Sequence, residues 1–253
     1  MASQRMHNRN LGTVISLCDL TGHMVLPWVD AGYRAVLVDP QHGISSDDGR
    51  VERIADTALG AAFRLGQIVR TENVVFVAGF PPCTDVAVSG SRWFAAKAAL
   101  DKHFQAKAAL VAEQCRMVGM LSGAPWFFEN PVSVFSSIFG LPDHTFSPED
   151  FTGHCANDNY TKKTCLWVGN GFVMPPAFKD STLGGPDNRI HTAPPGPERA
   201  NFRSATPMGF AEAVYLSNAP HLKLSILTET RLPRAANDNL KAANDNAEQT
   251  NLF

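Results

Sequence analysis

Short apolar runs alternate with stretches of helical spacing along the first half of the chain. Four runs have the length and composition of buried strands: Thr13–Cys18, Ala35–Asp39, Val74–Ala78 and Trp126–Phe128. Between them, three stretches repeat apolar residues at helical spacing: His23–Ala31, Val51–Leu65 and Lys97–Leu121. Strands that alternate with helices predict an α/β fold with a doubly wound, mostly parallel sheet.

Two of the expected helices have an apolar stripe that identifies the face turned to the core. The stripe of the first consists of Ile54, Ala58, Ala61 and Leu65. The stripe of the second consists of Leu100, Phe104, Val111, Cys115 and Val118. We expect both stripes to pack against the sheet.

The second half of the chain changes in texture. Residues 143–203 are rich in Pro, Gly, Asn and Asp with weak periodicity, which predicts loops and one hairpin around Thr164–Phe172. After Pro233, the pentapeptide Ala-Ala-Asn-Asp-Asn occurs at 235–239 and again at 242–246. Such a polar repeat cannot form a core. The sequence therefore predicts one domain over residues 10–232 and a disordered tail over 233–253.

Composition restricts the class of protein. A chain of 253 residues with 44% hydrophobic content can bury one large core. A net charge of −2 means that any contact with nucleic acid needs a local basic patch. Five cysteines, an odd number without a CxxC pair, indicate a reducing cytoplasm. Without an apolar run long enough to span a bilayer, a soluble, cytoplasmic protein with no membrane partner is expected.

Residue types that carry chemistry occur where successive strands end. Asp19 and Gly22 follow the first strand, Asp39 ends the second, Pro82 and Cys83 follow the third, and Glu129 and Asn130 follow the fourth. Open α/β sheets bind ligands in the crevice beyond the carboxyl ends of their strands. The sequence therefore predicts one site at this edge.

These residues belong to an ordered series of short motifs. In chain order the motifs are Asp19-Leu20-Thr21-Gly22, Asp39, Gly79-Phe80-Pro81-Pro82-Cys83 with Ser89, Glu129-Asn130-Pro131, Tyr160-Thr161-Lys162-Lys163-Thr164 before Leu166-Trp167-Val168-Gly169, and Arg203-Ser204-Ala205-Thr206-Pro207 with Gly209, Ala211 and Ala213. The series resembles that of the cytosine carbon-5 DNA methyltransferases. The resemblance covers roughly residues 13–215, most of the expected domain.

The resemblance implies a fold, a cofactor and a set of site residues. The fold is a Rossmann-like sheet of the S-adenosylmethionine-dependent methyltransferase type, and the substrate is DNA. Cofactor contacts are implied for Asp19, Leu20, Thr21, Gly22, His23, Met24, Asp39, Pro40, Phe80, Pro82, Asn130, Ser204 and Thr206. Catalytic roles are implied for Cys83, Glu129 and Lys163, and substrate contacts for Ser89, Arg92, Lys162 and Arg203.

The chemistry explains why a thiol and a carboxyl group are needed. Carbon 5 of cytosine is a poor nucleophile, so the Cys83 thiolate would first add to the neighbouring ring carbon. We expect backbone amides and the sulfonium charge to lower the thiol pKa. Glu129, which follows two phenylalanines, would have a raised pKa and donate a proton to the ring nitrogen. The cytosine must be flipped out or unpaired.

The chain departs from the family pattern in three places. His23 and Met24 stand where a second glycine is usual, and Lys163 and Cys165 replace an arginine pair. Only about 35 residues, instead of a long recognition region, separate Gly169 from Ser204, too few to read the major groove extensively. This minimal, phage-like form predicts low sequence specificity, or a short context read by residues such as Lys179, Arg189 and Arg199.

The last five residues suggest a partner. Gln249-Thr250-Asn251-Leu252-Phe253 resembles the pentapeptide that binds the bacterial sliding clamp. In that comparison Leu252 and Phe253 would enter a pocket and Gln249 would fix the orientation. Tethering of this kind would raise the effective concentration of a weak DNA binder.

Two other functions stay open at this point. The same chemistry could act on RNA or a free cytosine nucleotide, or the fold could serve a non-catalytic protein that binds DNA or the clamp. Zinc deaminases are excluded because Pro82-Cys83-Thr84-Asp85 lacks the second cysteine of P-C-x-x-C. No metal site is expected, because the spacing of Cys155, Cys165, His144 and His154 fits no common zinc pattern.

Overall fold

The computed structural model describes residues 11–194, 196 and 199–223. Of the described residues, those up to Asn218 belong to one compact unit, which contains all strands and helices named here, and those from Ala219 on belong to a second. The tail motif with Gln249, Leu252 and Phe253 lies outside the described residues. Within the described part of the chain, no helix has the length and apolar character required to cross a bilayer.

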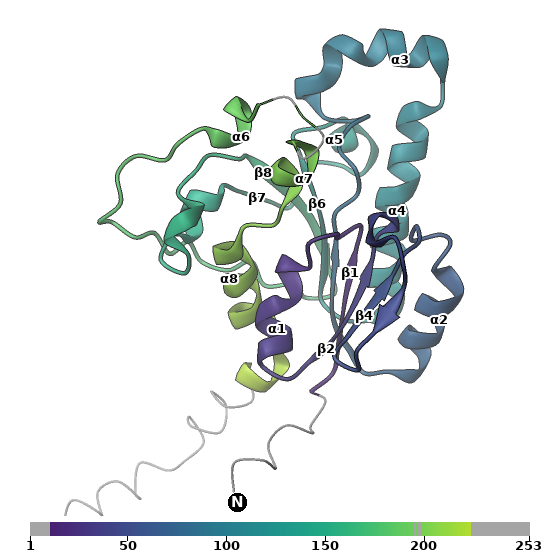
Figure 1. The fold of residues 1–253 in the computed structure, drawn as a ribbon, viewed down its shortest axis with the longest axis vertical. Helices are drawn as coiled ribbons and strands as arrows, with labels where there is room; N and C mark the ends of the chain where they lie inside the picture. The colour runs from purple at the N-terminus through teal and green to yellow at the C-terminus, as the bar shows by residue number, and fades with distance from the viewer. Residues whose placement is uncertain (1–10, 195, 197–198, 224–253) are drawn as a thin grey trace, which may run out of the picture. The chain divides into compact units, whose positions relative to one another are not determined.

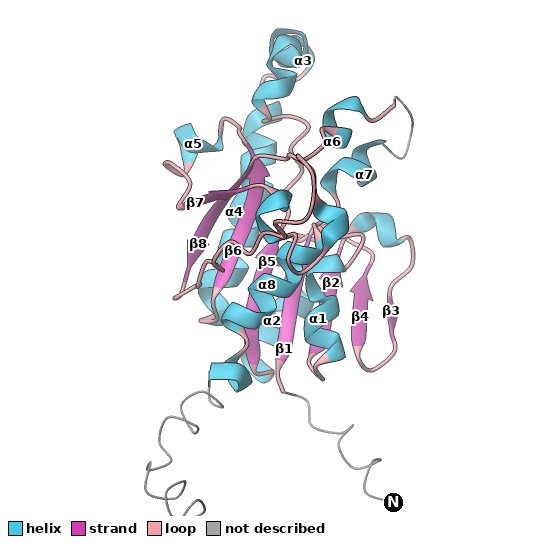
Figure 2. Ribbon diagram, turned by 90° about the vertical axis from the view of Figure 1, so that its left-hand side faces the viewer, coloured by secondary structure: helices cyan, strands magenta, loops and turns pink. Residues whose placement is uncertain are grey.

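An eight-stranded mixed sheet, mostly parallel, forms the centre of the fold (Figures 1 and 2). Its strands are β1 Thr13–Leu17, β2 Arg34–Val38, β3 Ser46–Asp47, β4 Val51–Ile54, β5 Val74–Gly79, β6 Trp126–Pro131, β7 His144–Phe146 and β8 Thr164–Gly169. The strand order is β3-β4-β2-β1-β5-β6-β8-β7. Strands β4, β2, β1, β5 and β6 run parallel, while β3 and β8 are antiparallel to their neighbours. The α/β fold expected from the alternation is therefore confirmed.

Helices cover both faces of the sheet. They are α1 Leu26–Asp30, α2 Ala62–Thr71, α3 Phe94–Leu100, α4 Phe104–Ser122, α5 Phe135–Ile138, α6 Arg189–Thr192, α7 Arg199–Ser204 and α8 Met208–Asn218. Helices α2 and α4 lie on one face, and α1 and α8 on the other (Figures 1 and 2). The strands between these layers are buried on both sides, which explains their continuous apolar sequences.

The expected helix over Val51–Leu65 is wrong in its first half. Residues Val51–Ile54 form β4, which pairs in parallel with β2, and the helix begins only at Ala62. Ala61 and Leu65 are buried as the stripe predicted. Ile54 fits the helical spacing but lies in a strand. Partners that are distant in the sequence decide this strand pairing, so the local spacing does not reveal it.

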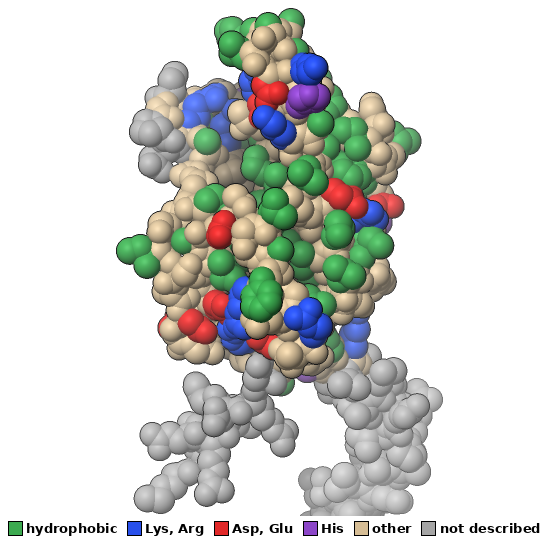
Figure 3. Space-filling view, turned by 90° about the vertical axis from the view of Figure 1, so that its right-hand side faces the viewer, with side chains coloured by type: hydrophobic (Ala, Val, Ile, Leu, Met, Phe, Trp, Pro, Cys, Tyr) green, Lys and Arg blue, Asp and Glu red, His purple; other side chains and the backbone are tan. Residues whose placement is uncertain are grey.

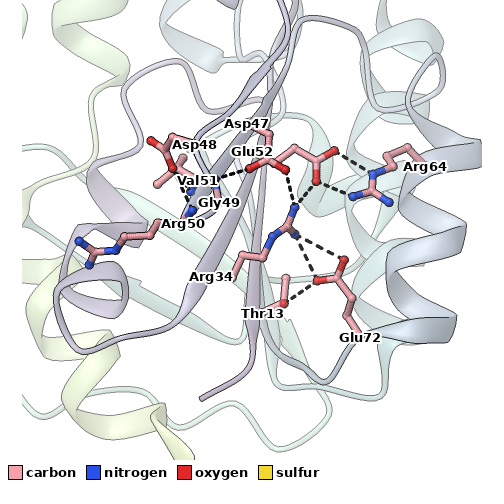
Figure 4. Close-up of polar contacts among 10 residues, drawn as sticks. All are labelled: Thr13, Arg34, Asp47, Asp48, Gly49, Arg50, Val51, Glu52, Arg64 and Glu72. Carbon is pink, nitrogen blue, oxygen red and sulfur yellow. Dashed lines mark hydrogen bonds and ion pairs between the residues drawn. The ribbon is translucent and has the colours of Figure 1, made fainter. Parts of the chain in front are cut away.

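Those partners form an ion-pair network around Arg34 (Figure 4). The Arg34 guanidinium pairs with Glu52, with Glu72 (3.2 Å) and with Asp47 (3.3 Å). Arg64 of α2 donates two hydrogen bonds of 2.8 Å to the Glu52 carboxylate. The network therefore joins β2, β3, β4 and α2, and it lowers the pKa of Glu52, mainly through the Arg64 hydrogen bonds.

We expect Glu52→Gln to destabilise the fold by about 1–2 kcal/mol near neutral pH, because the pair is mostly shielded from water. Since the folded-state pKa of Glu52 is lowered, its contribution is present above the unfolded pKa and is lost as pH falls through the folded pKa. Urea unfolding across this acid range measures the difference between wild type and variant. Glu113→Gln, which breaks the more exposed Glu113–Arg116 pair of α4, is the control. Equal losses for both variants, or a loss independent of pH, would contradict the prediction.

The long helix expected over Lys97–Leu121 is interrupted. Helix α3 ends at Leu100 and α4 begins at Phe104. Asp101 has an extended backbone, and its Oδ1 accepts a 2.9 Å hydrogen bond from the His103 N–H. This side-chain contact replaces the helical hydrogen-bond pattern. Leu100 is consequently 91% exposed and does not belong to the buried stripe, whereas Phe104 and Cys115 do.

The hairpin expected around Thr164–Phe172 has a different partner. Strand β8 pairs with β7, which precedes it in the chain, and with β6. After β8, Asn170 adopts a left-handed φ of 51° and donates from Nδ2 to the carbonyls of Gly119 and Ala124. These bonds attach the end of β8 to the end of α4, so the chain does not return as a strand there.

Candidate functional site

The carboxyl ends of β1, β5 and β6 lie side by side, which brings their following loops together. Leu17 is opposite Gly79, and Gly79 is opposite Phe128. The Phe80 N–H continues the pairing by donating to the Leu17 carbonyl at 2.9 Å. Strand β1 is also the point where the order reverses towards β2 on one side and β5 on the other. Ligands of open α/β sheets bind at such a switch point.

The loop after β1 is organised by the Asp19 carboxylate. Asp19 is buried and accepts hydrogen bonds from the Ser16 hydroxyl (2.7 Å), the Thr21 hydroxyl (3.1 Å) and the Gly22 N–H (2.8 Å). Gly22 has a φ of 69°, and a Cβ there would lie 2.9 Å from Leu37. Only glycine fits this turn without strain. Asp19 and Gly22 therefore shape the loop, while Leu20 is half-buried and Thr21 is exposed.

His23 and Met24 follow this turn with different surroundings. The His23 Nδ1 lies 3.2 Å from the Thr206 carbonyl, which connects the loop to the segment before α8. Met24 is fully buried, so its side chain belongs to the core. Asp39 is buried after β2, and its Oδ1 accepts from the Gln41 N–H at 2.8 Å. Oδ2 is then the Asp39 oxygen available to a ligand hydroxyl, next to the exposed Pro40.

The loop that carries Cys83 is held against the end of β6. The Asn130 side chain donates from Nδ2 to the Pro81 carbonyl at 2.9 Å. The Cys83 carbonyl accepts from the N–H groups of Val86 (3.1 Å) and Ala87 (2.9 Å). Phe80 packs edge-on against Phe127 with ring centroids 5.8 Å apart, whereas Pro82 is exposed. The turn therefore fixes the position of the Cys83 thiol.

Gly79 allows this loop to start close to helix α4. A Cβ on Gly79 would lie 2.6 Å from the Cys115 Cβ and 3.3 Å from the Phe128 Cβ. Any larger residue would separate α4 from β5 or β5 from β6. The glycine before the Phe-Pro-Pro-Cys segment is thus required by packing beneath the site.

The Glu129 carboxyl acts on the Cys83 thiol through its charge. Burial, followed by the charge of Glu129, raises the pKa of Cys83. Burial also raises the pKa of Glu129, as expected from its position. The expectation of a lowered Cys83 pKa is therefore wrong for the protein alone. Proximity of a thiol to a carboxyl that resists ionisation is nevertheless a typical property of a reactive site.

Lys162 and Arg203 supply positive charge to the same place. Lys162 lowers the pKa of both Cys83 and Glu129, and Arg203 lowers that of Cys83, each by less than burial raises it. Lys162 is half-buried, whereas Lys163 is exposed and acts on Cys165. The structure thus brings Lys162, which the sequence assigned to substrate contact, next to Cys83 and Glu129, and it leaves Lys163 at the periphery.

Three polar atoms near Cys83 are buried without a hydrogen-bond partner among the described residues. They are Oε2 of Glu129, Oδ1 of Asn130 and Nε of Arg203. Glu129 and Asn130 are consecutive in β6, and Arg203 is close enough to act on Cys83 electrostatically. Unsatisfied buried polar atoms are costly and rare. Two of them, Oε2 of Glu129 and Nε of Arg203, belong to groups that act on Cys83, which indicates a site prepared for a polar ligand.

The remaining expected contacts lie around this centre. Ser89 and Arg92 are exposed in the 3₁₀ turn Val88–Trp93, which follows the Cys83 loop. Ser204 is exposed at the end of α7, and Thr206 is buried beside His23. Within the described residues, no cluster of three or more His, Cys, Asp or Glu side chains is arranged to hold a metal ion.

A cavity of about 250 Å³ adjoins the loop after β1. His23 and Thr206 line it together with Asp158, Tyr160 and Arg189, but Cys83 and Glu129 do not. Asp158 accepts a 2.7 Å hydrogen bond from the Gly209 N–H at the start of α8, and burial raises its pKa. The sequence pattern does not indicate Asp158 as a site residue, because Asp158 lies in a loop-rich region without periodicity.

Comparison with known proteins adds no assignment. No protein-family model matches the chain, and no curated protein matches it.

Proposed function

We propose that the protein transfers a methyl group from S-adenosylmethionine to carbon 5 of cytosine in DNA, with Cys83 as nucleophile. The observation that carries this proposal is the convergence of Cys83, Glu129 and Lys162 at the ends of neighbouring strands, with Glu129 Oε2 buried and unpaired. A thiol beside a carboxyl of raised pKa is the pair that addition to a cytosine ring requires.

Each residue would perform a defined step. The Cys83 Sγ adds to carbon 6 of the ring, and the electron pair moves to ring nitrogen 3, which takes the proton of Glu129. Lys162 favours the thiolate over the thiol. After carbon 5 has gained the methyl group, a water molecule takes the proton of carbon 5 and the sulfur–carbon bond breaks with its electron pair on sulfur. The proton of nitrogen 3 returns to the Glu129 carboxylate, so that the thiolate of Cys83 and the acid Glu129 are both restored.

The residues at the end of β1 fit the proposed cofactor. S-adenosylmethionine, when bound, supplies an electrophilic methyl group. The tight Asp19–Gly22 turn, the oxygen Oδ2 of Asp39 and the contact of His23 with Thr206 would hold such a molecule between the loop and the start of α8. The strand order supports the methyltransferase type, because β4-β2-β1-β5-β6 corresponds to the 3-2-1-4-5 order of doubly wound nucleotide-binding folds.

DNA as the substrate is supported by the distribution of cations. Arg92, Lys102, Lys162, Lys163 and Arg203 form no ion pair with a carboxylate within the described ranges. These residues lie in the 3₁₀ turn Val88–Trp93 before α3, in α7, at the junction before α4 and in the segment before β8, at the end of the sheet where the site is (Figures 1 and 2). At the β2–β4 side, Arg34 and Arg64 are neutralised by acids, whereas Arg50 and Arg53 there form no ion pair with a described carboxylate. A local field of this kind attracts phosphates despite a net charge of −2.

Mass spectrometry of nucleosides tests the proposal. The full-length protein is incubated with unmethylated DNA and S-adenosylmethionine, beside Cys83→Ala and a control, Cys155→Ala, which removes a thiol from the loop before Asp158. We expect 5-methylcytosine, in many sequence contexts, from wild type and control and none above background from Cys83→Ala. Product that persists without Cys83, or its absence in the wild type while the cofactor binds, would contradict the proposed reaction. RNA or a cytosine nucleotide would then be tested as the acceptor.

A further inference from the structure

Helix α3 is an arm that buries little of its surface. No residue of Phe94–Leu100 is buried, although the sequence there and just before is rich in large apolar residues. Trp93 is 56% exposed, Val88 51% and Leu100 91%. Figures 1 and 3 show α3 standing at the end of the molecule beyond the sheet, with apolar side chains and cations at its surface. Apolar surface exposed in this way usually has a binding function.

The arm is firmly connected to the loop that carries Cys83. Lys97 of α3 donates to the Thr84 carbonyl at 2.8 Å and pairs with Asp85 at 2.6 Å. Phe94 packs edge-on against Phe104 of α4, with ring centroids 5.7 Å apart. The segment between loop and arm is also fixed, because the Val88 N–H donates to the Val132 carbonyl at 3.0 Å, just after Asn130. The segment that carries Trp93 is therefore anchored at both ends to the surroundings of the Cys83 loop.

Trp93 differs from the other tryptophans of the chain. Trp28, Trp126 and Trp167 are at most 5% exposed, and all four tryptophans are among the described residues. The Arg92 guanidinium lies over the Trp93 ring, 5.2 Å from its centroid. An exposed indole next to a guanidinium is a combination that binds a nucleobase by stacking and its phosphate by charge.

We propose that Trp93 is a stacking platform for an unpaired base of DNA beside the target cytosine, with Arg92 facing the adjacent phosphate. This inference rests on the DNA substrate of the proposed function and extends it to a single-stranded segment. The occupant is indicated by charge, because Arg92 and Lys102 at the two ends of the arm form no ion pair with a described carboxylate. An apolar protein partner would not require these unpaired cations.

Fluorescence titration of the full-length protein tests the platform. The probe is a cytosine-containing single strand of about 12 nucleotides, which suits one stacking groove. We expect the strand to quench the emission of the exposed Trp93. Trp93→Ala should weaken binding about tenfold and Trp93→Phe less than about threefold, since a phenyl ring still stacks. Leu100→Ala, which removes a more exposed apolar side chain from the same arm, should have no effect on affinity.

Three outcomes would overturn the platform: unchanged affinity for Trp93→Ala, equal losses for Trp93→Ala and Leu100→Ala, or a loss seen only with duplex DNA. The titration is repeated in the Cys83→Ala background without cofactor, so binding is measured apart from methyl transfer. Normal methylation without Trp93-dependent quenching would refute the platform alone. Trp93-dependent quenching without methylation would refute the proposed reaction alone.

Discussion

Glu129→Gln is expected to lower the rate of methyl transfer by about 10²–10⁴, the usual contribution of a general acid, while S-adenosylmethionine still binds. Glutamine has nearly the same volume as glutamate but provides no acidic proton. In the protein, Glu129 Oε2 is buried without a partner, and burial raises the pKa of this carboxyl. The group therefore stays protonated at higher pH than an ordinary glutamate, as a proton donor to ring nitrogen must.

The same substitution should lower the rate of methyl transfer but should not lower the free energy of unfolding. Because the folded-state pKa of Glu129 is raised, its stabilising contribution is complete below the unfolded pKa and is lost as pH rises through the folded pKa. A neutral amide does not ionise, so it does not lose stability as the pH rises. Glu129→Gln should therefore be at least as stable as the wild type at neutral pH. If Glu129 were retained for packing, the variant would be less stable than the wild type. A residue retained for function often makes the wild type less stable than such a variant.

Initial rates, cofactor affinity and urea unfolding measured on one preparation distinguish these roles. Glu149→Gln makes the same chemical change in the 3₁₀ turn Pro148–Phe151 and should leave the rate within about twofold, since it is remote from proton transfer. If Glu129→Gln kept the wild-type rate, Glu129 would not be the proton donor. If it lost both stability and cofactor binding, its role would be structural.

The sequence predicted the parts of the fold that depend on local pattern. The runs at Thr13, Ala35, Val74 and Trp126 became strands because residues buried on both faces must be continuously apolar. Strand β4 was missed because it has only four residues, two of them the polar Glu52 and Arg53. It is a strand because it pairs with β2 and because Glu52 binds Arg34. The break before α4 depends on one side-chain contact of Asp101, which apolar spacing does not reveal.

For the candidate site, the order of the strands predicted which loops lie together, but the sequence did not show where the side chains point. Residues after β1, β5 and β6 could be placed at one edge, because parallel strands end together. The sequence motif assigned the catalytic role to Lys163 and substrate contact to Lys162. Motif position does not separate the two, since adjacent residues of extended chain point in opposite directions and a shift by one residue exchanges them. The pKa of Cys83 was likewise out of reach, because it depends on burial by residues distant in sequence.

The two lysines therefore provide the second large effect and its own control. We expect Lys162→Met to reduce methyl transfer about 100-fold near neutral pH, because it removes a charge that favours the Cys83 thiolate. Lys163→Met should leave the rate within about threefold. The two variants remove the same charge from adjacent positions and keep a long apolar stem. Of the two lysines, only Lys162 lowers the pKa of Cys83 and of Glu129, while Lys163 lowers the pKa of Cys165.

The direction of the pH effect follows from these charges. Without Lys162, the pKa of the Cys83 thiol rises further, so less thiolate is present at a given pH and the acid limb of the rate profile moves to higher pH. The pKa of Glu129 rises as well, so this carboxyl keeps its proton to higher pH and the alkaline limb moves in the same direction. The whole profile should therefore shift to higher pH, which a loss of folding or of DNA affinity alone would not produce.

Alkylation of Cys83 by iodoacetamide gives a readout that is independent of turnover. The rate of modification follows the thiolate fraction and can be measured by mass spectrometry of the peptide that contains Cys83. It should be slower in Lys162→Met than in Lys163→Met and the wild type, across the pH range below the thiol pKa. Equal alkylation rates in all three proteins would remove Lys162 from thiol activation. A larger effect in Lys163→Met would instead assign the catalytic role to Lys163, as the resemblance of the Tyr160–Thr164 motif implies.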